Sequence, residues 1–252
     1  MDNNIKHDNG IELKNNKKHN SEMKINTDLL KANSITGYFF RLLFMLLIPA
    51  AQGIYFLINL TTTTAYDITI FLDKFIPFNE WFIIPYVFWY IYTFGALLVL
   101  AFTDYKTYFK LLFSIVTGML VCFLVYVIFP TTVPRPSIEG TNILKQMVLY
   151  IYGNDKPYNC FPSIHMMDTL LITLFAFKHN RSRILKLSSA VICVSIYLST
   201  FFVKQHSILD AVASTILAVG LFYVFENEYV LRKMENIREI ITFRKRVEEL
   251  SE

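Results

Sequence analysis

The chain has 252 residues, of which 54% are hydrophobic and 16% aromatic but only 17% charged. Together with a mean hydropathy of +0.41, this composition excludes an ordinary soluble globular enzyme and indicates a membrane protein. The formal net charge of +4 is not gathered in a basic stripe with interleaved aromatic residues, so a nucleic-acid-binding protein is excluded as well.

The first element predicted along the chain is a polar tail at residues 1–34. It contains eight asparagines, six lysines and five acidic residues without apolar periodicity, which is typical of a disordered cytoplasmic segment. The tail is too long and too polar to open a cleavable signal peptide, so we expect the first apolar run to stay as a membrane anchor.

Six apolar stretches follow the tail. In chain order, these predicted spans are residues 42–65, 81–103, 111–134, 160–177, 187–203 and 207–225. A helix needs about 20 apolar residues to cross the hydrocarbon core. The fourth stretch is the weakest, because it contains His165 and Asp168. The expected fold class is an all-α membrane protein, a six transmembrane helix bundle that forms one domain at residues 35–226.

Two further segments show amphipathic patterns. Residues 66–80 place Phe71, Leu72, Phe75 and Ile76 on one side of a predicted interfacial piece. In residues 227–252, apolar side chains recur at helical spacing among alternating Arg, Lys and Glu, which predicts a charged cytoplasmic helix on the membrane or on a partner.

The basic residues predict the orientation of the bundle. With six spans, 19 of the 24 Lys and Arg residues fall on the side that holds both termini, and 5 fall on the other side. The positive-inside rule then places both termini in the cytoplasm. A bias towards Asn, Lys and Ile favours an AT-rich bacterial genome, so the expected localisation is a bacterial cell membrane.

The three cysteines provide neither a disulfide framework nor a C-x-x-C metal or redox spacing. Cys122 and Cys193 fall inside predicted spans, and Cys160 lies alone near the outer face. We therefore expect no metal and no other cofactor.

Polar residues cluster where three predicted spans meet the extracytoplasmic side. The third span ends in "FPTTVPRPSIEG" with Arg135, the fourth opens with "CFPSIH", and the sixth opens after "VKQHSILD". Inserting an Arg, Lys or Asp at the centre of a membrane span costs about 2.5 to 3.5 kcal/mol. Ionisable residues near or within a span are therefore interpreted first as functional residues.

The residue types in this cluster suit phosphoryl transfer. His206 and Asp210 are four residues apart, so on a helix the carboxylate can orient one ring nitrogen while the other acts as a nucleophile or base. The alternative is a satisfied buried pair between helices. A second histidine, His165, follows a serine hydroxyl by two residues, while Arg135 and Lys204 offer positive charge for phosphate oxygens.

These blocks resemble the signatures of the type 2 phosphatidic acid phosphatases, a superfamily of integral membrane lipid phosphatases and phosphotransferases. The matching stretches are "RP" at residues 135–136, "PSIH" at 162–165 in place of the usual PSGH, and "STFFVKQHSILD" at 199–210. The resemblance implies that His206 attacks phosphorus, that Asp210 holds its ring and that His165 protonates the leaving oxygen. It also implies that Arg135 and Ser163 bind the phosphoryl oxygens.

Two positions depart from the family pattern. The family usually has a lysine seven residues before Arg135 and an arginine after the serine of the third block, whereas this chain has Ile128 and Thr200. Lys204, two residues before the expected nucleophile, is the candidate replacement cation.

Several of these residues also have a purely structural interpretation. Ser163 fits a helix N-cap, Arg135 an anchor to lipid headgroups, and Lys204 a side chain that extends to the interface. Asp168 could orient His165 or form a plain interhelical hydrogen bond.

The sequence favours a metal-independent membrane phosphatase for a lipid phosphate or diphosphate, such as phosphatidic acid, phosphatidylglycerophosphate or a polyprenyl diphosphate. Two alternatives stay open. One is headgroup transfer like that of the sphingolipid synthases, in which an alcohol takes the phosphoryl group. The other is a catalytically silent membrane scaffold or transporter. The expected partners are the lipid phosphate and the bilayer, with no nucleic acid.

Overall fold

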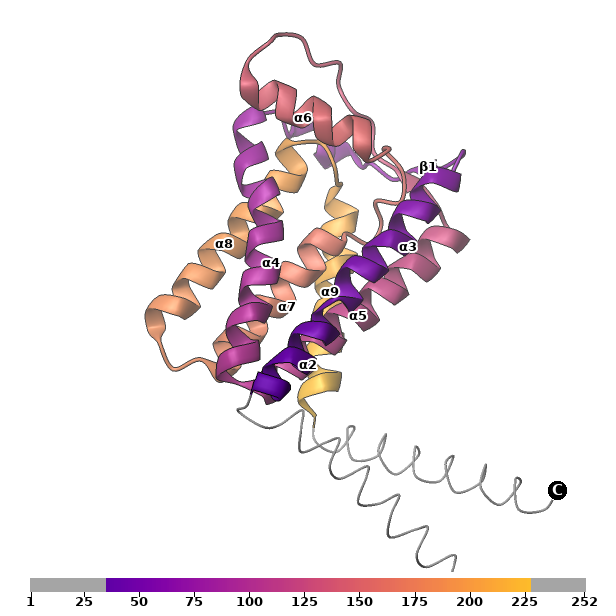
Figure 1. Cartoon of the computed structure of the whole chain (residues 1–252). Helices are drawn as coiled ribbons and strands as arrows, with labels where there is room; N and C mark the ends of the chain where they lie inside the picture. The colour runs from indigo at the N-terminus through magenta and orange to yellow at the C-terminus, as the bar shows by residue number, and fades with distance from the viewer. Residues whose placement is uncertain (1–34, 228–252) are drawn as a thin grey trace, which may run out of the picture.

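The computed structural model describes residues 35–227, which form a bundle of helices (Figure 1). Of these residues, 76% are helical, as expected for an all-α membrane protein. The tail predicted at 1–34 and the amphipathic helix predicted after Asn227 lie outside the described residues. In chain order the helices are α2 (Ile35–Met45), α3 (Leu47–Thr61), α4 (Ile83–Thr103), α5 (Tyr105–Ile128), α6 (Ile143–Asn154), α7 (Ile164–His179), α8 (Arg183–Phe202) and α9 (Ile208–Glu226).

Within residues 35–227, five helical segments are long and apolar enough to cross a membrane. They cover Ile35–Thr61, Glu80–Thr103, Tyr105–Ile128, Arg183–Phe202 and Ile208–Glu226, each of which overlaps a predicted span. The fourth predicted span corresponds to α7, whose 16 residues measure about 24 Å at 1.5 Å per residue, less than the hydrocarbon core of about 30 Å. The sixth crossing therefore stays a prediction.

Capping residues explain where helices differ from the predicted spans. Asp104 accepts hydrogen bonds from the backbone N–H groups of Lys106 and Thr107, at 3.1 and 3.2 Å, so α5 begins six residues before the predicted span at 111. The same helix ends at Ile128, because Pro130 cannot continue it. Apolarity alone does not locate such ends, since the caps are polar.

Helix α7 occupies the centre of the bundle and packs against α9, α8 and α5 (Figure 1). Gly118 of α5 allows the close approach of these helices. A Cβ atom at this position would overlap Met167 Sδ of α7 and would lie 2.9 Å from Leu221 Cδ1 of α9. The two helices that carry His165 and Asp210 therefore meet α5 at a residue without a side chain.

Shorter elements cover one end of the bundle, opposite the end where the described residues begin and finish (Figure 1). Helix α6 lies across this end, between the third and fourth predicted spans, where the sequence predicted no helix. Strands β1 (Tyr66–Asp67) and β2 (Thr131–Thr132) pair in parallel beside the 3-10 helices η1 (Phe71–Phe75) and η2 (Glu80–Phe82). Phe71, Leu72 and Phe75 are exposed there, as an interfacial segment requires.

A larger side chain at Gly118 should loosen the contact of α5 with α7 and α9. We expect Gly118→Val to destabilise the protein by about 1–3 kcal/mol, because the added methyl groups overpack the core. The midpoint of thermal unfolding in detergent measures this effect. Gly95→Val is the matched control, because a Cβ there meets nothing within 4 Å. Equal midpoints for the two variants would contradict this packing.

Candidate active site

His206 and Asp210 form a buried hydrogen-bonded pair at the start of α9. His206 Nδ1 lies 3.1 Å from Asp210 Oδ2 and 3.0 Å from the carbonyl oxygen of Cys160. Because both partners are acceptors, Nδ1 carries the proton and donates to them. In the neutral ring with this tautomer, the other nitrogen, Nε2, has the lone pair that a nucleophile requires.

The predicted contact between His206 and Asp210 forms, but the two residues do not share one face of a helix as predicted. His206 does not lie on α9, because Ser207 is the N-cap of that helix. Asp210 Oδ2 instead turns back and accepts the backbone N–H of Ser207 at 2.8 Å as well as His206 Nδ1. The carboxylate thus caps α9 and orients the histidine at the same time.

His165, in the first turn of α7, lies opposite His206, with 5.6 Å between the ring centroids. Its ring is held between Trp89 and Tyr86 of α4, at centroid distances of 4.3 and 4.8 Å. Within residues 35–227, His165 Nε2 is buried without a hydrogen-bond partner, and Asp168 forms no hydrogen bond to this ring. The aromatic rings of α4, not Asp168, therefore position His165.

Ser163 is the N-cap of α7, and its hydroxyl accepts a hydrogen bond from Met166 N at 3.4 Å. Its own backbone N–H donates to Ser214 Oγ of α9 at 2.7 Å, and Ser214 Oγ in turn donates to the carbonyl of Asp210 at 2.6 Å. Ser163 and Ser214 are fully buried. These bonds join the start of α7 to the helix that carries Asp210.

Arg135 is held by the end of α6. Its Nη1 donates to the carbonyl oxygens of Asp155, at 2.7 Å, and Tyr152, at 3.3 Å, while Nη2 donates to Gln205 Oε1 at 2.6 Å. The guanidinium also stacks over the Tyr152 ring, 4.3 Å from its centroid. Gln205 precedes His206, so Arg135 is tied directly to the loop that carries the histidine.

Lys204 adopts a positive φ of 55° and directs its ammonium group to the segment before α4. Its Nζ donates to the carbonyl oxygens of Asp73, at 3.2 Å, and Ile76. Burial lowers the pKa of Lys204, and the charge of Asp73 opposes this shift. The two positions where family cations are absent differ in exposure, since Ile128 is largely exposed and Thr200 is buried.

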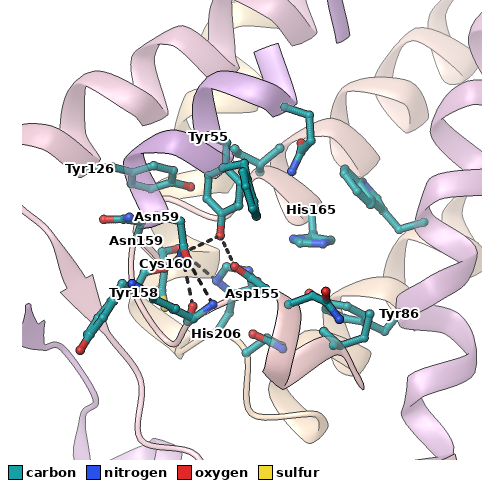
Figure 2. Close-up of a pocket in the computed structure, with 18 of the residues that line it drawn as sticks. Tyr55, Asn59, Tyr86, Tyr126, Asp155, Tyr158, Asn159, Cys160, His165 and His206 are labelled. Atoms are coloured by element: carbon teal, nitrogen blue, oxygen red, sulfur yellow. Dashed lines mark hydrogen bonds between the residues drawn. The ribbon is translucent and has the colours of Figure 1, made fainter. Parts of the chain in front are cut away.

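Two cavities share His206. One, of about 240 Å³, contains both histidines and is lined by α3, α4, α6 and α7 (Figure 2). The other, of about 440 Å³, contains Arg135, Lys204 and Lys74 together with His206. The predicted site residues therefore separate into a cavity that holds both histidines and a cavity that holds the cations.

Sequence reasoning did not identify the residues that line the first cavity opposite the histidines. Tyr55 of α3 donates from its hydroxyl to Asp155 Oδ1 at 2.6 Å, and Asn59 bonds to the carbonyls of Lys156 and Tyr158 (Figure 2). The only signal was the polar "GNDKPYN" stretch just before "CFPSIH". Its contacts with α3 span about a hundred residues, which no local pattern shows.

Within residues 35–227, no group of three or more His, Cys, Asp or Glu side chains could hold a metal ion. The described part of the site therefore offers hydrogen-bond donors, two histidines and several cations, among them Arg135 and Lys204. This set fits phosphoryl transfer by a nucleophilic histidine. Metal independence itself stays a prediction.

The fold and this site define an integral membrane protein with a histidine–carboxylate pair at one end of a helical bundle. A family model described as the PAP2 superfamily matches residues 55–224, and the chain belongs to that superfamily, as the three sequence blocks indicated. Membership supports a phosphatase activity. Searches of curated proteins and of solved structures found no match.

Ser214→Ala tests the link between α7 and α9. The change leaves the buried N–H of Ser163 without an acceptor, which should cost about 1–3 kcal/mol of stability. Thermal unfolding in detergent measures the loss. Ser195→Ala serves as the control, because its hydroxyl donates only to Val191 of its own helix in the described part of the chain. A Ser214→Ala protein as stable as this control would refute the link.

Proposed function

We propose that the protein is a membrane lipid phosphatase that hydrolyses a lipid phosphate or diphosphate through a phosphohistidine intermediate. One observation carries the proposal. His206 Nδ1 donates to Asp210 and Cys160, so Nε2 is the free nucleophile of a ring that lies 5.6 Å from His165. This separation suits a phosphoryl group bound between the two rings.

Each histidine has one role in each half of the reaction. Nε2 of His206 bonds to phosphorus while His165 protonates the departing alcohol oxygen. In the second half, His165 takes a proton from water, which attacks phosphorus and releases His206. Asp210 holds the His206 ring and stabilises the positive charge that develops on it.

Arg135, Ser163 and Lys204 are proposed to bind the phosphoryl oxygens. Arg135 and Lys204 are engaged by backbone carbonyls, yet a guanidinium has five N–H donors and an ammonium three. Ser163 is fully buried and lines neither cavity, so its proposed role rests on its place at the start of α7, whose N-terminus favours negative charge. No metal ion takes part in the proposed reaction.

Headgroup transfer is the second candidate function, and the small number of positive charges around the histidines favours it. Ile128 and Thr200 leave two family cations absent, and the cavity with both histidines contains Asp155. Such a site suits a phosphodiester with one negative charge better than a phosphate monoester with two. The same phosphohistidine would then be attacked by an alcohol instead of water.

Lys204→Ala should lower turnover of a lipid phosphate about 100- to 1,000-fold, because losing one donor to the developing charge costs about 2.7–4 kcal/mol. Lys204→Arg should recover part of this loss. Turnover in mixed micelles is the measurement, and Lys145→Ala, which lines neither cavity, is the control. Near-normal turnover of Lys204→Ala would leave Arg135 as the principal cation.

The same assays separate the histidines. His206→Ala should form no phosphoenzyme, whereas His165→Ala should still form one from a substrate with a good leaving group. The intermediate must be trapped without acid, because phosphohistidine is acid-labile. An active His206→Ala protein would refute the mechanism, and a protein inactive on every lipid phosphate would favour the silent scaffold.

We also propose that the site faces the extracytoplasmic side of a bacterial cell membrane, with both termini in the cytoplasm. A cysteine at Glu139, near α6, should then react with an impermeant thiol reagent on intact cells, whereas one at Lys178, at the opposite end of α7, should react only after permeabilisation. The native cysteines Cys122, Cys160 and Cys193 are buried and give little background. The reverse labelling would invert the orientation.

A further inference from the structure

The cavity that contains both histidines is a box of aromatic rings. Its walls carry Tyr55, Tyr86, Trp89, Tyr90, Tyr126 and Tyr150. These rings come from α3, α4, α5 and α6, so the box lies under α6 between α3 and α4 (Figures 1 and 2). An aromatic face is negative at its centre and attracts cations.

Asp155 adds a carboxylate to this box. Its Oδ1 accepts the hydroxyl proton of Tyr55, and no other hydrogen bond reaches the carboxylate from residues 35–227. Arg135 donates to the backbone carbonyl of Asp155 and not to its carboxylate. Burial raises the pKa of Asp155, while the Tyr55 hydrogen bond and the charge of Arg135 oppose the rise.

Among residues 35–227, no cation forms an ion pair with this carboxylate. Lys156 is the one Lys or Arg among the described residues that line it, and its Nζ donates to the carbonyl of Leu60 at 2.9 Å. Arg135 and Lys204 line the other cavity. A second negative charge on the substrate would be repelled by this carboxylate, whereas an organic ammonium group would meet the carboxylate and the rings that do not contact His165.

We infer that the aromatic box binds the ammonium headgroup of a zwitterionic phosphodiester lipid, whose phosphate lies at His206. The inference rests on the proposed phosphohistidine chemistry and names its substrate class. Nε2 of His206 bonds to phosphorus, the bond from phosphorus to the lipid alcohol oxygen breaks, and His165 protonates that oxygen. The headgroup stays on the phosphohistidine until water or an acceptor alcohol attacks, gives its proton to His165 and releases His206.

A structural role for Asp155 is the competing explanation. The Tyr55–Asp155 hydrogen bond joins α3 to the end of α6, and the bonds of Asn59 to the loop after α6 join the same two parts. Two variants separate the roles. Tyr55→Phe removes this hydrogen bond but keeps a ring and the carboxylate, whereas Asp155→Asn keeps an acceptor for Tyr55 but removes the charge.

The first experiment measures binding without turnover. The probes are choline and its uncharged isostere 3,3-dimethylbutan-1-ol, added to the full chain in detergent with Trp81→Phe, so that Trp89 fluorescence reports on the box. Choline should bind at least about tenfold more tightly than the isostere. Asp155→Asn should abolish this difference, and Tyr55→Phe should keep it. Equal binding of both probes, or loss of the difference in Tyr55→Phe alone, would overturn the inference.

The second experiment compares lipids with identical acyl chains. Diacylglycerol release should be at least about tenfold faster from phosphatidylcholine or phosphatidylethanolamine than from phosphatidylglycerol or phosphatidic acid. Asp155→Asn should narrow that ratio, while Glu139→Gln, an exposed carboxylate outside both cavities, should not. Fastest release from phosphatidic acid would overturn the headgroup inference and leave the proposed phosphatase intact. Absence of both release and phosphohistidine with every lipid would overturn the proposed function.

Discussion

One carboxylate oxygen determines the geometry of the site. Asp210 Oδ2 accepts hydrogen bonds from the backbone of Ser207 and from His206 Nδ1, so a single atom starts α9 and selects the tautomer of the histidine. Since Asp210 is fully buried, neither bond competes with water. Two further hydrogen bonds attach neighbouring segments to the first turns of α9. Ser163 N donates to Ser214 Oγ, and Ile208 N donates to Asp73 Oδ1.

The rest of the site depends on side chains that satisfy backbone groups in irregular segments. Arg135 binds carbonyls at the end of α6, Lys204 binds carbonyls at the end of η1, and Asn59 binds the loop after α6. Irregular backbone near a bilayer needs such partners, because lipid cannot supply them. The polar residues at the end of the bundle covered by α6 therefore stabilise the conformation of its loops in addition to their proposed roles in the reaction.

The sequence predicted what is local and failed where partners are distant. The spacing of four predicted the His206–Asp210 contact, although the contact forms through the cap of α9 and not along the helix, and five candidate spans follow from apolar runs near the length of a bilayer. Helix α6 escaped prediction because its apolar residues are interrupted by polar ones and its partners lie elsewhere in the chain. The Tyr55–Asp155 bond, between residues 100 apart, has no sequence pattern at all.

The attachment of Arg135 to α6 has a thermodynamic consequence. Tyr152 and Asp155 offer Arg135 their carbonyls at the C-terminal end of α6, where the helix dipole is negative. An anion that displaced these carbonyls from Arg135 would compete with the docking of α6, so the two free energies would be reciprocal. Tight docking weakens anion binding, and a bound anion loosens the helix that covers the cavity.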